Sequence, residues 1–264
     1  MMNVILFFAV ILFSNIIQGI TGFAGTILAM PPSLMLVGYP VAKPVLNVLG
    51  LMSGLYVFAG NRKSVCWKEL KKIVAVMAAG IIAGILIRGF FEGKEQILYK
   101  ILGAFVVILS VQGGMKLRAQ EKKESKFEKP ASEAMEGQTA EGKTAKGDSF
   151  VPYLILGLAG IVHGIFVSGG PLLIGYLTRK VRDKVSFRAT ISTVWVFLNS
   201  LILIDDIRAG LWSIELLKIQ LISVPVLLAG MFLGGKLYAR MSQRLFMMIT
   251  YILLFISGVL LFIK

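Results

Sequence analysis

Long apolar runs without charged side chains set the strongest limit on how this chain can fold. Inside lipid, backbone N–H and C=O groups must be satisfied within the protein, and a helix needs about 20 apolar residues to cross a hydrocarbon core about 30 Å thick. Hydrophobic residues make up 56% of the chain, against about 45–50% in soluble domains. Windows approaching the required length lie at residues 2–20, 73–87, 97–111, 191–204, 216–233 and 245–263. The pattern predicts an all-α polytopic membrane protein.

Basic residues gather in short loops between these runs. The chain has a formal net charge of +14, but its placement is typical of membrane orientation, in which cytoplasmic loops are rich in Lys and Arg. We therefore expect membrane lipid, and no nucleic acid, as a partner. Loops at 61–72, 179–188 and 236–244 are predicted to be cytoplasmic, and the acidic or balanced stretches 92–95 and 205–215 to face outwards.

The two ends of the sequence carry separate expectations. The first apolar run starts at the N-terminus without a basic leader, which favours a first transmembrane helix over a cleaved signal peptide. Counting crossings from the cytoplasmic loops places the C-terminus outside.

A polar stretch divides the apolar sequence into two pieces of similar size. Residues 116–150 are poor in apolar side chains and rich in Lys, Glu, Gly and Ala, which predicts a solvated linker with a possible helical first part. The linker starts with several basic residues, so it is expected to be cytoplasmic. The predicted organisation is a first membrane repeat at 1–115, a cytoplasmic linker at 116–150 and a second membrane repeat at 151–264.

The two pieces match each other at a nearly constant offset of 145 residues. Gly19, Gly25, Lys43 and Trp67 in the first piece correspond to Gly164, Gly170, Arg188 and Trp212 in the second. The charge pattern puts Lys43 outside and Arg188 inside, so equivalent points lie on opposite sides of the membrane. The sequence therefore predicts two inverted repeats.

Each repeat opens with an interrupted apolar segment. The first is broken around 22–25 and again at Pro31-Pro32, and the second is broken at 168–171. Because both segment pairs must begin and end on the same side, each is a glycine-broken hairpin or re-entrant segment, followed by three transmembrane helices. This gives ten apolar segments. The sequence leaves open whether the short second member of each hairpin spans the membrane.

The paired breaks predict a binding site. Non-helical backbone at membrane depth is tolerated only beside protein or a water-filled cavity, and paired interruptions in inverted repeats point to a transporter's binding site. A helix that starts after a break directs free N–H groups and partial positive charge at the gap, which favours a small anion. The alternative is that these glycines serve only close helix packing.

The polar side chains of the apolar segments agree with an anionic substrate. The acidic residues outside the linker lie in loops or at segment ends, whereas cation transporters and proton pumps usually place carboxylates along the pathway. The apolar segments instead offer neutral groups: Asn15, Gln18, Thr21, Asn47, Ser53, Ser168, Ser192, Thr193, Asn199 and Ser200. The candidate substrate-binding residues are Gln18, Gly19, Thr21, Gly22, Gly25, Asn47, His163, Gly164, Ser168, Gly169, Gly170 and Asn199.

His163 is the single histidine of the chain and matches Gln18 of the first repeat. Its side chain could bind substrate, carry a coupling proton or form a structural hydrogen bond. With one His and one Cys, the sequence predicts no metal site, no cofactor and no catalytic residues. A Ser168–His163 dyad is disfavoured because residues five apart on one segment do not face each other.

Two motifs carry a family resemblance across essentially the whole chain. "GITGFAGTILAMPPSLML", from Gly19, and "GIVHGIFVSGGPLLIGYL", from Gly160, resemble the paired glycine-rich motifs of the sulfite exporter TauE/SafE family. The resemblance implies an inner-membrane carrier for sulfite, organosulfonates or related sulfur-containing anions. By position, the family's motifs fall on Gly19, Gly22, Gly25, Pro32, Gly164, Gly169 and Gly170.

The chain departs from that pattern in two places. Ala24 stands where a further glycine is common, and the second repeat has no counterpart of Pro31-Pro32, so its half-helix is expected to be shorter or straighter. The expected function is a secondary transporter, an exporter that works by alternating access, with a proton or the membrane potential as the coupling force. An anion channel and a non-transporting membrane assembly protein remain as alternatives.

Overall fold

The computed structural model describes residues 2–89, 95–127, 150–181 and 183–238, together with residues 248, 251–252, 255–256 and 258–259. Every regular element in these residues is helical, which confirms the all-α prediction for the described part of the chain. The helices are α1 Met2–Thr21, α2 Gly25–Val37, α3 Tyr39–Asn61, the short 3₁₀ helix η1 Arg62–Ser64, α4 Trp67–Gly89, α5 Glu95–Phe127, α6 Val151–Phe166, α7 Gly170–Lys180, α8 Lys184–Arg208 and α9 Ile214–Tyr238.

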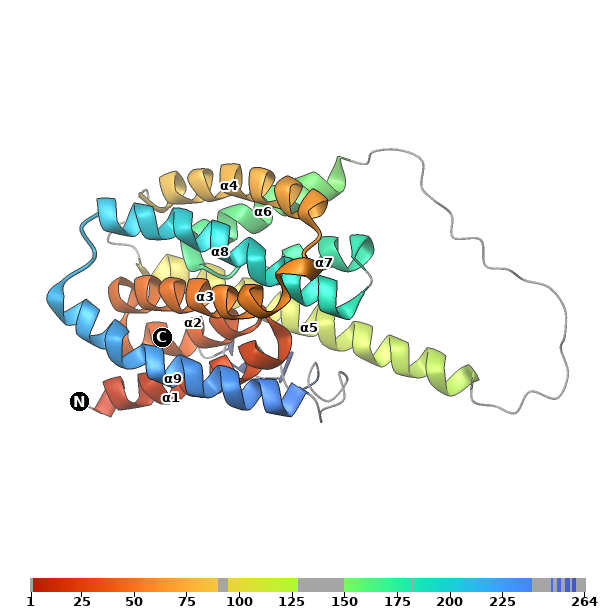
Figure 1. The fold of residues 1–264 in the computed structure, drawn as a ribbon, viewed down its shortest axis with the longest axis horizontal. Coiled ribbons are helices and arrows are strands. Elements are labelled where there is room, and N and C mark those ends of the chain that lie inside the picture. Colours follow the sequence, from red (N-terminus) through yellow and green to blue (C-terminus); the bar gives the residue numbers. More distant parts are fainter. Residues whose placement is uncertain are drawn as a thin grey trace, which may run out of the picture.

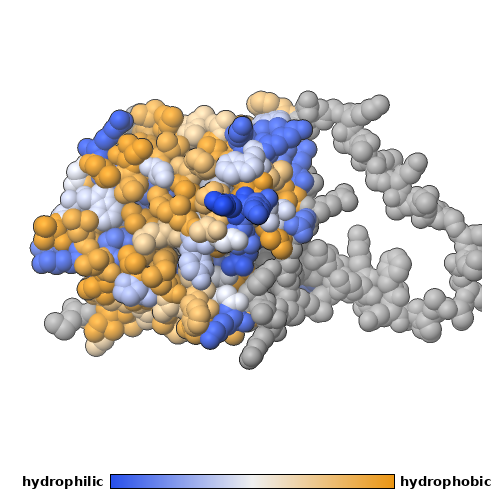
Figure 2. All heavy atoms as spheres, in the orientation of Figure 1, coloured by the Kyte–Doolittle hydropathy of each residue, from blue (hydrophilic) through white to orange (hydrophobic). Residues whose placement is uncertain are grey.

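Five of the described helices are long and apolar enough to cross a membrane: α1, α3, α4, α8 and α9. Their outer surfaces are apolar, as shown by Phe13 on α1, Leu86 on α4 and Leu221 on α9, whose side chains are all well exposed. Figure 2 shows apolar residues over most of the visible face, with hydrophilic residues gathered towards the ends of the long axis. This is the surface that lipid requires.

The long helices form three layers. Figure 1 shows α3 and α8 in the middle, with α4 and α6 along one side and α1 and α9 along the other. Both outer pairs cross at glycine. A Cβ added to Gly234 would lie 2.2 Å from the Ile16 carbonyl oxygen, and a Cβ added to Gly160 would lie 2.4 Å from the Met77 carbonyl oxygen. Small residues at these positions let the backbones touch, as is common between membrane helices.

The helices break at both predicted glycine clusters. α1 ends at Thr21 and α2 begins at Gly25, while α6 ends at Phe166 and α7 begins at Gly170. Within the breaks Gly22 has a φ of 80° and Val167 a φ of 54°. The left-handed conformation is easy for glycine but strained for a β-branched residue, at about 1–3 kcal/mol. The surrounding structure must therefore hold the second break in place.

The predicted break at Pro31-Pro32 is wrong. Both prolines lie inside α2, and the helix continues through them to Val37. Proline removes an amide donor, but its fixed φ is close to the helical value, and membrane helices tolerate it where neighbouring groups take up the freed carbonyls. α7, with 11 residues, is shorter than the 13-residue α2.

The polar linker and the last apolar segment are described only in part. α5 continues to Phe127, so the beginning of the predicted linker is helical. Residues 128–149, and most of the apolar run predicted at 245–263, lie outside the described residues.

Candidate functional site

The two helix breaks lie next to each other in the centre of the molecule. A Cβ added to Gly170, at the start of α7, would lie 3.6 Å from the carbonyl oxygen of Phe23 in the first break. A Cβ added to Gly22 would lie 3.0 Å from the Ser192 hydroxyl on α8, and that hydroxyl donates to the Gly22 carbonyl at 3.4 Å. The breaks therefore contact each other and the central helix α8.

Side chains from α1 cap the N-terminus of α2. The Gly25 N–H donates to Oε1 of Gln18 at 2.7 Å, and Nε2 of Gln18 donates to the Ser53 hydroxyl on α3 at 3.1 Å. The Thr21 hydroxyl accepts from the N–H groups of Phe23, at 3.4 Å, and Ala24, at 3.2 Å. Gln18, which is 4% exposed, thus joins α1, α2 and α3 at one point.

His163 has the equivalent place in the second half. The Gly169 N–H, just before α7, donates to Nδ1 of His163 at 3.3 Å, and Nε2 of His163 lies 2.8 Å from Oδ1 of Asn199 on α8. Because Nδ1 accepts a backbone hydrogen, we assign the neutral tautomer with its proton on Nε2, which then donates to Asn199. The imidazole also packs against the Trp195 ring, with centroids 4.9 Å apart.

These caps change one expectation from the sequence. We expected free N–H groups at the starts of the two half-helices, but those of Phe23, Ala24, Gly25 and Gly169 have neutral side-chain acceptors. The physical reason is that an unpaired buried N–H is costly, so an empty site must satisfy its own donors. An anion can bind these donors only by replacing the Thr21 hydroxyl, the Gln18 oxygen or the His163 nitrogen.

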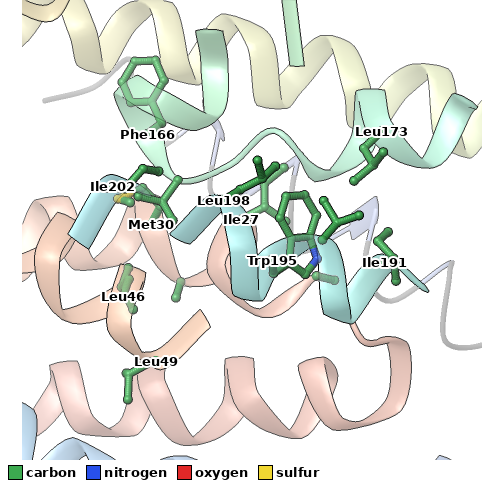
Figure 3. Close-up of a cluster of buried hydrophobic side chains, with 14 of the residues drawn as sticks. Ile27, Met30, Leu46, Leu49, Phe166, Leu173, Ile191, Trp195, Leu198 and Ile202 are labelled. Atoms are coloured by element: carbon green, nitrogen blue, oxygen red, sulfur yellow. The ribbon is translucent and has the colours of Figure 1, made fainter. Parts of the chain in front are cut away.

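A small cavity lies beside the first cap. It has room for about one water molecule, with about 10 Å³ open to a water's centre. The lining residues are Ser14, Asn15, Gln18, Gly25, Thr26, Ala29, Leu46, Leu49, Gly50 and Ser53. At the offset of 145 residues, Gly50 corresponds to Trp195. The Trp195 ring lies against His163 and close to Gly170, under the non-helical link between α6 and α7 (Figure 3). The two halves therefore differ at this position: Trp195 packs a large ring against His163, whereas Gly50 lines the cavity and packs closely against Asn199.

The structure brings most of the predicted site residues together. Gln18, Thr21, Gly22 and Gly25 surround the first break, and His163, Ser168, Gly169 and Gly170 surround the second. Asn47 and Asn199 join α3 to α8, since Nδ2 of Asn47 donates to the Asn199 carbonyl at 3.1 Å.

Gly19 and Gly164 have other neighbours. A Cβ at Gly19 would lie 2.9 Å from the Met231 carbonyl oxygen on α9, and a Cβ at Gly164 would lie 2.7 Å from the Ile81 carbonyl oxygen on α4. These two glycines face the outer helix crossings, and helix packing accounts for them.

The sequence analysis missed an ion pair. Lys43 on α3 pairs with Asp206 on α8, and neither side chain is exposed. From the sequence, Lys43 was expected outside and Asp206 at a segment end, with no carboxylate within the packed helices. α8 continues to Arg208, so Asp206 lies in its last turn, inside the protein. The sequence did offer one sign of this pair, because Lys43 is a charged residue in an otherwise apolar run, two helical turns before Gly50.

The sequence also provided no indication of Ser14 and Gly50, which line the cavity, or of Trp195, whose ring packs against His163. Single serine, glycine and tryptophan residues are common in membrane helices, and no sequence pattern marks them. Only the constant offset between the repeats links Gly50 to Trp195.

Known proteins give the context for this geometry. The sequence profile of the family described as "Sulfite exporter TauE/SafE" matches residues 6–261. The chain is also 23% identical, over 199 residues, to the Comamonas testosteroni protein named "Probable inner membrane transporter protein TsaS", a match that covers 75% of this chain and 73% of that protein. No solved structure matches the chain.

Proposed function

This chain belongs to the sulfite exporter TauE/SafE family, and from that premise we propose that it is a secondary transporter that exports a small sulfur-containing anion. The substrate is sulfite, an organosulfonate or a related oxyanion. The relative in Comamonas testosteroni is named an inner membrane transporter, and the apolar helices suit the same place, so we assign this protein to the inner membrane as a multi-pass protein.

One observation carries the proposal: two half-helix N-termini meet in the centre of the protein, and neutral side chains cover both. Helix N-termini bear partial positive charge and free donors, so they attract anions. Gln18 Oε1 and His163 Nδ1 supply the acceptors that the empty site needs. A sulfur oxyanion has several acceptor oxygens and can take over both roles. No carboxylate lines the cavity beside Gln18, so an arriving anion meets no like charge there.

We further infer that the two halves are inverted repeats that alternate access to this site. In support, α2 and α3 start at Gly25 and Tyr39, while α7 and α8 start at Gly170 and Lys184, each shifted by the same 145 residues. The packing repeats as well, because α1 lies along α9 as α6 lies along α4. Such repeats move against each other around a fixed central site. From the positions of the basic loops we infer a cytoplasmic linker and a C-terminus on the outside.

The small cavity fits a closed conformation. It holds about one water molecule, so the surrounding helices must move before a substrate can enter. The geometry suits an occluded carrier conformation in which the substrate site is empty and closed.

Purified protein tests the proposal directly. We expect sulfite, thiosulfate or sulfoacetate to raise the thermal unfolding temperature, while matched cationic compounds leave it unchanged. In proteoliposomes, uptake of the stabilising anion should saturate and show counterflow. Stabilisation by cations alone, or ohmic single-channel currents, would contradict an anion carrier.

A further inference from the structure

A buried ion pair closes one end of the crossing between α3 and α8. Nζ of Lys43, in the first turns of α3, contacts Oδ1 of Asp206 in the last turn of α8, and both side chains are completely buried. Oδ2 of Asp205 lies 3.7 Å from the same Nζ, but the Asp205 side chain is 22% exposed. Lys43 is therefore a cation with two carboxylates of different accessibility beside it.

Other close contacts also hold the two helices together. Below the pair, a Cβ at Gly50 would lie 2.5 Å from the side-chain Nδ2 of Asn199, and one at Gly54 would lie 2.7 Å from the Ser192 backbone carbonyl oxygen. Burying two opposite charges is often no better for stability than packing apolar residues of similar size. Ionisable residues inside membrane-spanning helices most often mark substrate or ion pathways.

Neutral hydrogen bonds connect the pair to the candidate site. One turn below Lys43, Nδ2 of Asn47 donates to the Asn199 carbonyl at 3.1 Å. The Asn199 side chain lies 2.8 Å from Nε2 of His163, whose other nitrogen caps the start of α7. Leu46, between Lys43 and Asn47, lines the cavity beside Gln18. Lys43 thus lies about one helical turn along α3 from the residues beside the proposed anion site.

We propose that Lys43 is an anion-binding residue of the transport pathway and that Asp206 occupies it between substrates. This inference rests on the proposed function. The Asp206 carboxylate is, like the transported oxyanion, a negatively charged group with oxygen acceptors, so it stands in for that anion in the closed conformation. When a sulfur oxyanion takes the Lys43 ammonium, Asp206 is released and α3 can separate from α8 at this end. Exchange of one carboxylate for one oxyanion keeps the buried cation paired throughout.

The test compares variants of the full-length protein in proteoliposomes. Lys43→Gln/Asp206→Asn and Lys43→Met/Asp206→Leu both remove the two completely buried charges together. The carboxylate that stays beside them, Asp205, is 22% exposed to solvent. We expect both double variants to unfold within a few degrees of the wild type and to raise the KM for sulfite at least tenfold. Asp206→Asn alone leaves Lys43 available, so it should bind sulfite several-fold more tightly. Glu215→Gln, which removes an exposed carboxylate in the first turn of α9, is the matched control and should keep KM within twofold.

The outcomes separate this inference from the proposed function. If the wild type neither transports nor is stabilised by sulfite, thiosulfate, sulfate or sulfoacetate, the proposed function is wrong. If the wild type transports one of them and a folded double variant keeps the wild-type KM, Lys43 does not bind the anion. If neither double variant folds, the pair is structural and the inference is equally overturned.

Discussion

Nε2 of His163 lies 2.8 Å from Oδ1 of Asn199, and this contact ties the broken segment of the second repeat to the central helix α8. The other ring nitrogen accepts the Gly169 N–H, so both nitrogens of the buried imidazole are used within the protein. In the first repeat the amide of Gln18 makes the equivalent pair of contacts, to Gly25 and Ser53. At both helix breaks, a neutral side chain with one acceptor and one donor can therefore cap the backbone N–H and bind the neighbouring helix.

His163→Gln should therefore preserve the cap. The glutamine oxygen can accept from Gly169 and its NH2 group can donate to Asn199, as Gln18 does in the other half. We expect the stability to fall by less than about 1 kcal/mol, compared with about 1–3 kcal/mol for His163→Ala, which leaves buried polar groups unpaired. Thermal or denaturant unfolding of the purified variants measures the difference.

The same variant tests the proton role of His163. In the closed conformation a second proton would sit on Nδ1 and face the Gly169 N–H. Because two hydrogen-bond donors would then face each other, this geometry disfavours a charged imidazole. We expect His163→Gln to transport sulfite with an unchanged response to a pH gradient. Loss of the pH-gradient response with retained downhill transport would instead identify His163 as the coupling residue.

Gln18→Glu should weaken anion binding without removing the cap. A carboxylate at this position still accepts from Gly25, but it places a negative charge where the substrate is expected. We predict at least a tenfold rise in the KM for sulfite, equivalent to about 1.4 kcal/mol. Gln220→Glu on α9 is the control, because Gln220 is also buried but does not line the cavity. Equal effects of the two substitutions on KM would argue against a site at Gln18.

Gly50→Ala should disturb the centre of the protein. The added Cβ would lie 2.5 Å from the Asn199 side-chain nitrogen, which is closer than the two atoms can approach. We expect a loss of about 1–3 kcal/mol of stability, the usual effect of overpacking, together with reduced transport because Asn199 also holds His163. Gly60→Ala, on the same helix with nothing within 4 Å of its added Cβ, should change neither property, and the pair can be compared by thermal unfolding and sulfite flux.

Two adjacent glycines on α9 provide a test of helix packing. A Cβ at Gly234 would lie 2.2 Å from the Ile16 carbonyl oxygen, whereas a Cβ at Gly235 meets nothing within 4 Å. Gly234→Ala should lower stability by about 1–3 kcal/mol, and Gly235→Ala should be neutral or slightly stabilising, as alanine favours the helix. If both variants unfold at the wild-type temperature, α1 and α9 do not cross as closely as the structure shows.

Much of the fold could be predicted because membrane helices are encoded locally. The apolar runs around residues 2–20, 73–87, 191–204 and 216–233 correspond to α1, α4, α8 and α9. Glycine clusters marked both helix breaks, since glycine is the residue that permits a positive φ such as that of Gly22. Pro31-Pro32 misled the analysis because proline loses its helix-breaking effect where tertiary packing takes up the freed carbonyls.

The site was less accessible to sequence reasoning. The offset of 145 residues pairs Gln18 with His163, and both side chains accept a backbone N–H beside a helix break, but the offset could not show this capping. Ser14 and Gly50 became visible only when three helices were placed around one cavity, and Trp195 only when its ring was placed against His163.

The sequence alone was enough to predict several of the long helices and the two breaks at the glycine clusters, because these depend on apolar length and local backbone freedom. The tertiary structure alone decided which groups meet: Lys43 with Asp206, His163 with Asn199, and Gly50 with the Asn199 side chain. Such pairs join residues more than 30 positions apart, and their partners depend on the depth and angle at which helices cross, which no local pattern encodes.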